Sequence, residues 1–318
     1  MSGSVSLSRR ARVAAYVALT KPRIIELLLV TTVPTMIVAE QGLPSPWLMA
    51  CTVIGGTLAA GGANAVNMVV DRDIDRLMER TRGRPLVTGA MSPQAALTFA
   101  IALEVLAFAL LWGTVNLLSA VLAVAACLFY VFVYTLWLKR TSSRNIVIGG
   151  AAGAVPTLIG WSAVTGTLDW APLVLFGIIF YWTPPHFWAL AIRYRDDYAA
   201  ADVPMLPVVE SMRRTSERIL VYTLLLWVLT VAFSPVAGMG HLYLGTALVL
   251  GGVFTWYALQ LRRGSRDIGP AGTGVAVAGG VGEVELRAVA MRTFAWSITY
   301  ITLLFGAMAA DQLLRSGW

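Results

Sequence analysis

An apolar stretch that is long enough to cross a membrane runs into an unusually polar segment, ANAVNMVVDRDIDRLMERTRGRPL, at residues 63–86. Four oxygen-bearing side chains in this segment are spaced by three, four and four residues: Asn64, Asn67, Asp71 and Asp75. On a helix this spacing places them in one stripe, while Asp73 projects elsewhere. A polar stripe that begins within a membrane is costly unless it faces a cavity and binds something. Because Mg²⁺ takes oxygen ligands, commonly one or two carboxylates plus substrate phosphates, the stripe predicts a catalytic Mg²⁺ site.

Arginines crowd the same segment, which contains Arg72, Arg76, Arg80, Arg82 and Arg84. Guanidinium groups clamp phosphate oxygens in bidentate fashion. Carboxylates for a metal, arginines for its phosphates and an adjoining apolar bundle together indicate a lipid-like diphosphate as substrate. A loop that only fixes the orientation of the chain in the membrane is the alternative, and it would explain the arginines but not the Asn/Asp stripe.

The predicted diphosphate contacts come from three parts of the chain. They are Arg72, Arg76 and Arg84 in the polar segment, Lys139 and Arg140 further along, and Arg23 near the N-terminus. The last three stand at the ends of predicted spans, where Lys and Arg flank most membrane helices for other reasons.

A second acidic pair, Asp196 and Asp197, occurs in the run YWTPPHFWALAIRYRDDYAAADVPMLPVV at residues 181–209. Both carboxylates stand at a predicted membrane boundary, between Tyr194 and Tyr198. An even number of predicted helices separates them from the first cluster, so the two clusters end spans that run in the same direction. We therefore expect both clusters to face one cavity, where they could hold two Mg²⁺ ions on one diphosphate.

The elements that must position these residues are membrane spans. The chain has 318 residues, of which 58% are hydrophobic and only 13% charged, and its mean hydropathy is +0.72. A soluble domain carries about a quarter charged residues. Apolar runs of roughly 20 residues mark bilayer-spanning helices, and they predict nine spans at residues 24–44, 47–70, 92–112, 117–138, 145–165, 170–192, 217–237, 240–261 and 289–310.

The fold predicted from these spans is an all-α polytopic membrane protein. Two parallel four-helix units would surround a central cavity, and a ninth helix would be added to them. A cytoplasmic arm at residues 1–23 would precede the single transmembrane domain at 24–310, which would include a flexible Gly-rich loop at 264–285. A short external tail would occupy 311–318.

The basic residues report the orientation of these spans. Every Lys and Arg except Arg315 falls on one side when the nine spans alternate. The positive-inside rule makes that side cytoplasmic, with the N-terminus inside and the C-terminus outside. The net charge of +7 therefore reflects topology and gives no indication of a nucleic-acid partner. A bacterial inner membrane is the expected location.

The run from Asn67 to Asp75 resembles the N-x-x-x-D-x-x-x-D signature of the UbiA superfamily of membrane prenyltransferases. A fuller set of segments is similar to the heme O synthase branch of that superfamily. These segments are LTKPRIIELLLVTTVPTM, NMVVDRDIDRLMERTRGRPL, RNIVIGGAAGAVPTLIGW, TPPHFWALA and DDYAAADVPMLPVV. The resemblance runs from about Leu19 to Pro207.

This resemblance implies farnesyl transfer from farnesyl diphosphate to a vinyl group of heme b, with water supplying a new hydroxyl. The products would be heme O and diphosphate. Asn67, Asp71 and Asp75 match the first metal and diphosphate motif, while Asp196 and Asp197 lie in the second. The superfamily's second motif is often D-x-x-x-D, and here Ala201 stands four residues after Asp197. The implied cofactor is Mg²⁺, and the implied partners are the lipid bilayer and a heme-oxidising heme A synthase.

The implied heme substrate gives His186 a candidate role. It follows the pair Pro184-Pro185 inside a span. A lone histidine in a helix is commonly a packing residue, but here a contact with the heme iron or a propionate is the alternative. Asn64, Tyr194 and Tyr198 complete the predicted heme or cavity contacts.

Two other functions compete with this reading. A UbiA-type enzyme acting on an aromatic or quinone precursor would share the diphosphate chemistry and differ only in its acceptor pocket. An ion-coupled transporter could use intramembrane carboxylates as an ion pathway. The placement of acids and arginines together at one membrane face, away from the midplane, argues against transport.

Overall fold

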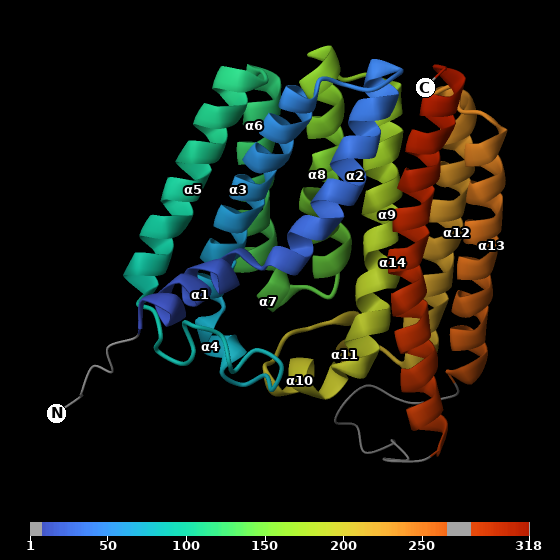
Figure 1. Cartoon of the computed structure of the whole chain (residues 1–318). Helices are drawn as coiled ribbons and strands as arrows, with labels where there is room; N and C mark the ends of the chain where they lie inside the picture. The colour runs from blue at the N-terminus through green and yellow to red at the C-terminus, as the bar shows by residue number, and fades with distance from the viewer. Residues whose placement is uncertain (1–7, 266–280, 318) are drawn as a thin grey trace.

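The computed structural model describes residues 8–265 and 281–317, and within them it leaves out the side chains of 23–29, 281 and 283. Over these ranges the chain forms helices and no strands. Figure 1 shows long helices that run side by side, with short helices gathered at the lower end of the bundle. The all-α membrane architecture predicted from the sequence is confirmed.

The long helices follow one another along the chain, with longer connections after α3 and α9 that contain the short helices. They are α1 (Arg9–Thr20), α2 (Pro22–Glu40), α3 (Pro46–Val70), α5 (Pro93–Thr114), α6 (Leu117–Leu128), α8 (Asn145–Thr165), α9 (Trp170–Arg193), α12 (Met212–Val236), α13 (His241–Gly264) and α14 (Val281–Arg315). A π-helical segment, η1 (Phe129–Leu138), continues α6 into α7 (Lys139–Thr141). The short helices are α4 (Arg72–Asp75), α10 (Arg195–Ala200) and α11 (Leu206–Val209).

Within the described residues, eight helices are long and apolar enough to cross a membrane, and each coincides with a predicted span. One of the eight is the continuous helix Leu117–Thr141, which joins α6, η1 and α7. The remaining predicted span, 24–44, falls on α2, of which the described apolar part is Val30–Glu40. The count of nine therefore stays a prediction.

Capping residues explain why the helices begin where they do. Pro46 and Pro93 occupy the first turn of α3 and α5, where the missing N–H of proline costs nothing. The Asn116 side chain accepts a hydrogen bond from the Ser119 N–H at 2.8 Å, and the Asp169 carboxylate accepts one from the Ala171 N–H at 3.0 Å. These caps provide acceptors for backbone donors that have no partner inside the helix.

The helices pack as two halves joined through the middle. Helices α3, α5 and α6 lie at one side of the bundle, and α12, α13 and α14 lie at the other, with α8 and α9 between them. Helix α14 packs against α13, α9 and α2, while α2 also packs against α8 and α3. The C-terminal half has an aromatic core that includes Tyr243, Phe254 and Tyr300. The N-terminal half is packed on smaller residues such as Ala59, Ala107 and Ala120.

Two predicted boundaries need correction at the ends of α14. The predicted loop 264–285 includes residues 266–280, which lie outside the described residues, but 281–285 belong to α14 because the Gly-rich composition ends at Gly282. The predicted tail 311–318 is helical as far as Arg315. The helix continues there because the Asp311 carboxylate accepts hydrogen bonds from the N–H groups of Gly240 (2.6 Å) and Tyr243 (3.2 Å) at the start of α13.

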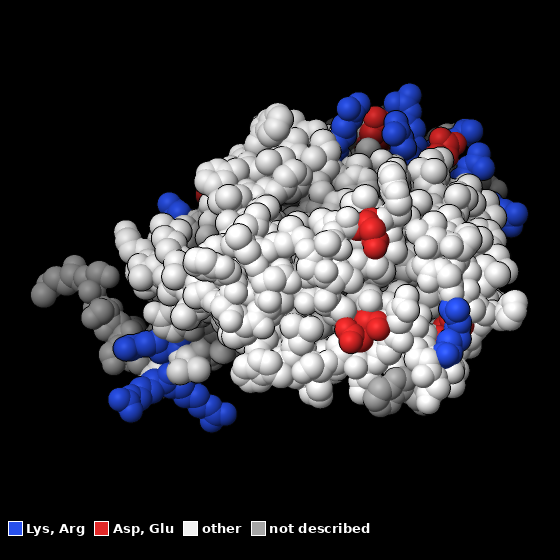
Figure 2. Space-filling model, turned by 90° about the horizontal axis from the view of Figure 1, so that it is seen from above, with Lys and Arg blue, Asp and Glu red and all other residues white. Residues whose placement is uncertain are grey.

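Charge is unevenly distributed between the two ends of the bundle. Figure 2 looks down on the end that carries the C-terminus, whose surface is mostly uncharged, with blue side chains mainly at its outline. The opposite end carries the polar segment after α3 and the short helices α4, α10 and α11.

Candidate active site

The predicted polar stripe continues from α3 into α4. Helix α3 ends at Val70, Asp71 follows it, and Asp75 closes α4. Asn67, Asp71 and Asp75 are all buried, with at most 2% of each residue exposed, and Asn64 is 5% exposed. The break after Val70 is small enough for the side chains to stay on one face, so the structure brings all four together.

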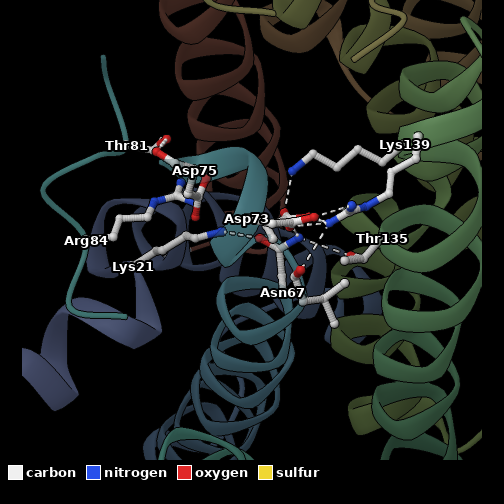
Figure 3. Close-up of polar contacts among 11 residues, drawn as sticks. Lys21, Asn67, Asp73, Asp75, Thr81, Arg84, Thr135 and Lys139 are labelled. Atoms are coloured by element: carbon white, nitrogen blue, oxygen red, sulfur yellow. Dashed lines mark hydrogen bonds and ion pairs between the residues drawn. The ribbon is translucent and has the colours of Figure 1, made fainter. Parts of the chain in front are cut away.

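Hydrogen bonds fix the positions of Asn67 and Asp71 relative to each other (Figure 3). The Asn67 amide nitrogen, Nδ2, donates to Asp71 Oδ2 at 2.7 Å and to Thr135 Oγ1 at 3.1 Å. The Lys21 ammonium donates to Asn67 Oδ1 at 2.8 Å. Because both ends of the amide have partners, the orientation of Asn67 is fixed.

Cations from distant parts of the chain pair with the two buried carboxylates. Lys139 Nζ forms an ion pair with Asp71 Oδ2, and Arg84 Nη1 lies 2.6 Å from Asp75 Oδ2. The other oxygen of Asp71, Oδ1, is buried and has no hydrogen-bond partner within the described residues, and Arg140 Nη2 lies 3.9 Å from it. The site therefore contains one enclosed carboxylate oxygen that has no hydrogen-bond partner among the described residues.

Arg140 binds mainly to the carboxylate that lies outside the stripe. Its two terminal nitrogens each lie 2.7 Å from an oxygen of Asp73, and Nη2 also donates to the Val70 carbonyl at 3.1 Å. The hydrogen bonds from Arg140 hold the pKa of Asp73 well below its usual range. Arg140 thus stands at the edge of the site, with its charge largely matched by Asp73.

Lys21 has the most perturbed environment of the site's cations. Burial, followed by repulsion from Arg84 and Lys139, lowers the pKa of Lys21 to about 7. The residue has a left-handed backbone (φ 52°) between α1 and α2, and this turn directs its side chain toward Asn67 (Figure 3).

Three residues of the stripe, Asn64, Asn67 and Asp75, line a cavity of about 400 Å³ that extends into the bundle, and Asp71 adjoins them without being part of the lining. The polar end of the cavity is lined by Lys21, Asn64, Asn67, Asp75, Arg80, Arg84 and Lys139. Its inner wall is apolar and includes Ala63, Ala123, Gly153, Ile159, Ile179, Trp182 and Phe187. Tyr130, Tyr134 and Tyr198 also line the cavity. A compartment with a charged mouth and an apolar interior suits an amphiphilic ligand.

Neither carboxylate of the second acidic pair lines the cavity, and the two differ in their contacts. Asp197 accepts a hydrogen bond from the Arg80 N–H at 3.3 Å, which connects α10 with the loop after α4. The Asp196 side chain is 75% exposed and pairs with Arg287 of α14 at 2.9 Å. Tyr194 lies under the Arg80 guanidinium, 5.5 Å from it, and burial raises the pKa of Tyr198. Within the described ranges, no group of three or more His, Cys, Asp or Glu converges as a ready-made metal site.

Some predicted contacts lie away from the cavity. Arg72 and Arg76 are exposed, and Arg72 donates to the Val69 carbonyl at 2.8 Å. The side chain of Arg23 lies outside the described residues. His186 is buried against α14, where Nδ1 and Ser297 Oγ are 2.7 Å apart. Its ring stacks on Trp182, while the cavity is lined by its neighbours Thr183 and Phe187.

Sequence reasoning missed two cavity cations and an aromatic pair. Lys21 had no predicted role, and Arg80 was named among the arginines able to clamp phosphate but not among the predicted diphosphate contacts, although both line the cavity. Tyr130 and Tyr134 stack on one another on η1, with ring centroids 5.3 Å apart. The sequence signal for this pair was its spacing from Lys139. Tyr130, Tyr134 and Lys139 fall on one side of a π-helix but not of an α-helix.

Comparison with known proteins identifies the architecture. The model of the UbiA prenyltransferase family matches residues 28–273. The chain belongs to the UbiA prenyltransferase family. Within this family it is 52% identical to a protoheme IX farnesyltransferase from Parafrankia sp. (strain EAN1pec), covering 95% of this chain and 91% of that protein. It is 50% identical to a protein of the same name from Streptomyces coelicolor, covering 96% and 92%.

Solved UbiA-type structures share the fold at low sequence identity. A structure of digeranylgeranylglyceryl phosphate synthase superposes with a TM-score of 0.73 at 14% identity, covering 95% of this chain and 99% of that one. A UbiA homologue from Archaeoglobus fulgidus, bound to GPP and Mg²⁺, gives a TM-score of 0.62 at 17% identity, covering 90% and 99%. Membership of the family makes the chain a membrane prenyltransferase, as the sequence motifs predicted.

Proposed function

We propose that this prenyltransferase transfers the farnesyl group of farnesyl diphosphate to a vinyl group of heme b, giving heme O and diphosphate. The observation that best supports this proposal is the buried Asn/Asp stripe, which is flanked by cations and adjoins an apolar cavity. The choice of heme b as the acceptor rests on relatives that are 50–52% identical and are named protoheme IX farnesyltransferase.

The diphosphate would sit at the polar mouth. Lys21, Arg84 and Lys139 each stand in contact with a residue of the stripe, so a phosphate bound beside that stripe would lie within their reach. Arg80, held over Tyr194 at the second acidic segment, adds a fourth cation from the other side of the mouth. Cations fixed in this way stabilise the negative charge that develops on a departing diphosphate.

The donor set of the stripe fits Mg²⁺. Asp71 Oδ1 is buried without a hydrogen-bond partner in the described part of the chain, and Asp75 and the Asn67 amide add further oxygens. A site with two carboxylates suits Mg²⁺, which completes its coordination shell with substrate phosphates and water. Asp197 is the candidate from the second cluster, since Asp196 points outward. Bound Mg²⁺ would neutralise the leaving diphosphate as a Lewis acid.

The cavity would keep water from the reacting carbons. When the C1–O bond of farnesyl diphosphate breaks, its electron pair leaves with the diphosphate, and the vinyl π electrons form the new C–C bond to C1. The cation left beside the porphyrin takes up water, which then loses a proton to the diphosphate or to solvent. Tyr130, Tyr134 and Trp182 face the volume where these cations would form, and aromatic faces attract positive charge.

The location follows from the same proposal. The active site would face the cytoplasm of a bacterial inner membrane, because nearly all Lys and Arg residues lie at the end that carries the stripe. Heme O released there would be available to a heme-oxidising heme A synthase in the same membrane.

The decisive experiment offers radiolabelled farnesyl diphosphate and Mg²⁺ to the reconstituted protein, with heme b and 4-hydroxybenzoate as separate acceptors. We expect label in a product with the mass of heme O from the heme b reaction and none from the other. Transfer to 4-hydroxybenzoate alone would reassign the acceptor class to aromatic precursors. Transfer to neither, with intact farnesyl diphosphate recovered, would overturn the proposal.

A further inference from the structure

Helix α1 carries an apolar surface that nothing in the described chain covers. Its inner face is fixed to the bundle, because Ala15 and Leu19 are buried in a cluster with residues of α3 and α5. Tyr16 packs edge-on against Phe99 of α5, with ring centroids 4.8 Å apart. On the opposite side Val13 is 63% exposed and Val17 is 50% exposed.

These two valines belong to a continuous strip. With Ala14, Ala18 and Pro22 they line a shallow hollow, whose other lining residues are Arg9 and Arg10. We refer to Val13, Ala14, Val17 and Ala18 as the outer face of α1. A helix that is apolar on both sides and held to the protein on only one requires a second apolar environment.

An arginine cluster stands at the N-terminal end of the outer face. Arg9, Arg10 and Arg12 are exposed, and none of them forms an ion pair with the described residues. Cations in the first turn interact unfavourably with the helix dipole, so the stability of α1 does not account for them. The charge instead matches an anionic surface outside the protein.

The position of α1 identifies that surface. In Figure 1 the helix lies across the lower ends of α3 and α5, at the height of α7, where the membrane spans end. Lipid headgroups surround a protein at this level. We propose that α1 is an interfacial helix that docks on anionic phospholipids, with its outer face in the acyl boundary and its arginine cluster on the headgroup phosphates.

Docking would be coupled to the active site through Lys21, a step that rests on the proposed function. Lys21 ends α1, since its N–H donates to the Ala18 carbonyl at 3.3 Å, and α2 begins at the next residue. Its ammonium reaches Asn67 in the stripe. A lipid surface that holds α1 flat therefore also holds Lys21 at the diphosphate position.

A depth measurement on the full-length protein tests the docking. A fluorescent label on Val13→Cys is quenched by lipids brominated near the headgroup, in vesicles of phosphatidylcholine with or without phosphatidylglycerol. The unmutated protein, labelled in parallel, gives the background from Cys51 and Cys127. A label on Glu79→Cys, in the exposed loop after α4 at the same end of the bundle, is the matched control and should stay unquenched.

We expect strong quenching at position 13 in phosphatidylglycerol vesicles, and its loss when Arg9, Arg10 and Arg12 are changed to Gln. Changing Arg213, Arg214 and Arg263 to Gln removes the same charge from the same end without touching α1, and should leave quenching intact. Equal quenching in all vesicles and variants would overturn the headgroup recognition. Absence of quenching everywhere would overturn the docking and would indicate that another protein surface covers α1.

Binding of radiolabelled farnesyl diphosphate with Mg²⁺, measured in the same vesicles, tests the coupling. We expect severalfold weaker binding for the triple α1 variant than for the triple α12/α13 variant. Equal binding by the two variants would overturn the coupling while leaving the docking in place. If the unmutated protein binds no farnesyl diphosphate although position 13 is quenched, the proposed function fails and the docking stands.

Discussion

At the scale of single residues, the site is built from charges that satisfy one another in a buried place. Asp71 is paired with Lys139, and Asp75 is paired with Arg84. Removing one member of a buried pair leaves the other uncompensated and costs about 3–5 kcal/mol. Mutations at these positions must therefore be read with a stability measurement beside the activity measurement.

Asp71→Asn is expected to reduce turnover by about 100-fold or more, in line with losses seen when one group that stabilises developing charge is removed. The substitution keeps the shape of the side chain but removes the charge and one metal-ligating oxygen. Asp73→Asn is the matched control, because that carboxylate lies two residues away, is 60% exposed and binds Arg140. Steady-state rates for the two variants, with thermal unfolding to verify folding, make the comparison. Equal losses in both would contradict the assignment of Asp71 to the metal.

Lys21→Gln is expected to raise the KM for farnesyl diphosphate by about tenfold, which corresponds to about 1.4 kcal/mol. The glutamine keeps a polar side chain, one bond shorter than that of lysine, but carries no charge to the phosphate. Arg82→Gln is the control, since the Arg82 side chain is 68% exposed and pairs with Glu79 on the surface. A KM for Lys21→Gln that matches the Arg82→Gln value would remove Lys21 from the binding site.

The difference between these two predictions reflects what a sequence can reveal about a site. The stripe could be predicted because Asn67, Asp71 and Asp75 are spaced by one helical turn. Helices α3 and α4 keep that spacing on one face across Asp71. The role of Lys21 in the site could not be predicted, because 46 positions separate it from Asn67 in the sequence. Its approach depends on the packing of α1 and α2 against α3, which no local pattern encodes.

At the scale of elements, the winding of η1 places one wall of the site. Tyr130 and Tyr134 line the cavity, and Lys139 follows them after the end of η1. Nine residues make about two and a half turns of an α-helix, which would put Lys139 opposite Tyr130. The wider turns of a π-helix, with i→i+5 hydrogen bonds, bring all three onto one side.

Deleting Phe132, whose side chain is on the exposed surface of η1 (59% exposed), is expected to lower turnover by at least tenfold. If the shortened segment keeps its π-helical winding, Tyr130 is rotated by one residue relative to Lys139 and no longer shares its side of the helix. Phe132→Ala keeps the winding and should retain near-normal activity. Rates from both variants, with helix content from circular dichroism, provide the test, and full activity in the deletion variant would show that the π-helix does not position Lys139.

The elements themselves were predicted well where length and hydropathy decide them. The span 145–165 coincides with α8, and the other described spans differ mainly at their ends. Helix α1 and η1 were not anticipated. The first is too short and basic to register as a span, and the second differs from an α-helix only in hydrogen-bond register, to which the apolar pattern is insensitive.

At the scale of the whole molecule, two halves with different packing serve one cavity. Small residues let α3 approach α5 closely: a Cβ at Gly55 would lie 2.5 Å from Leu111. The aromatic core of α9, α12, α13 and α14 forms the other half. The stripe comes from α3 and α4, and its partners come from the junction of α1 and α2, the loop after α4, η1 and α7. Because α8 and α9 provide much of the inner wall, neither half contains the site alone. The sequence placed the two acidic segments at one end of the bundle, but the contacts of Asp197 with Arg80 and of Asp196 with Arg287 depend on how the helices pack.

The orientation of the whole molecule in the membrane is the remaining prediction from the charge pattern. If the basic end is cytoplasmic, a cysteine at Glu79 should be protected from a membrane-impermeant maleimide in intact cells and become labelled after permeabilisation. A cysteine at Leu43, in the connection after α2 and 43% exposed, should be labelled without permeabilisation. The unmutated chain controls for Cys51 and Cys127. The reverse labelling pattern would place the diphosphate site outside the cell, where a cytoplasmic prenyl donor could not reach it.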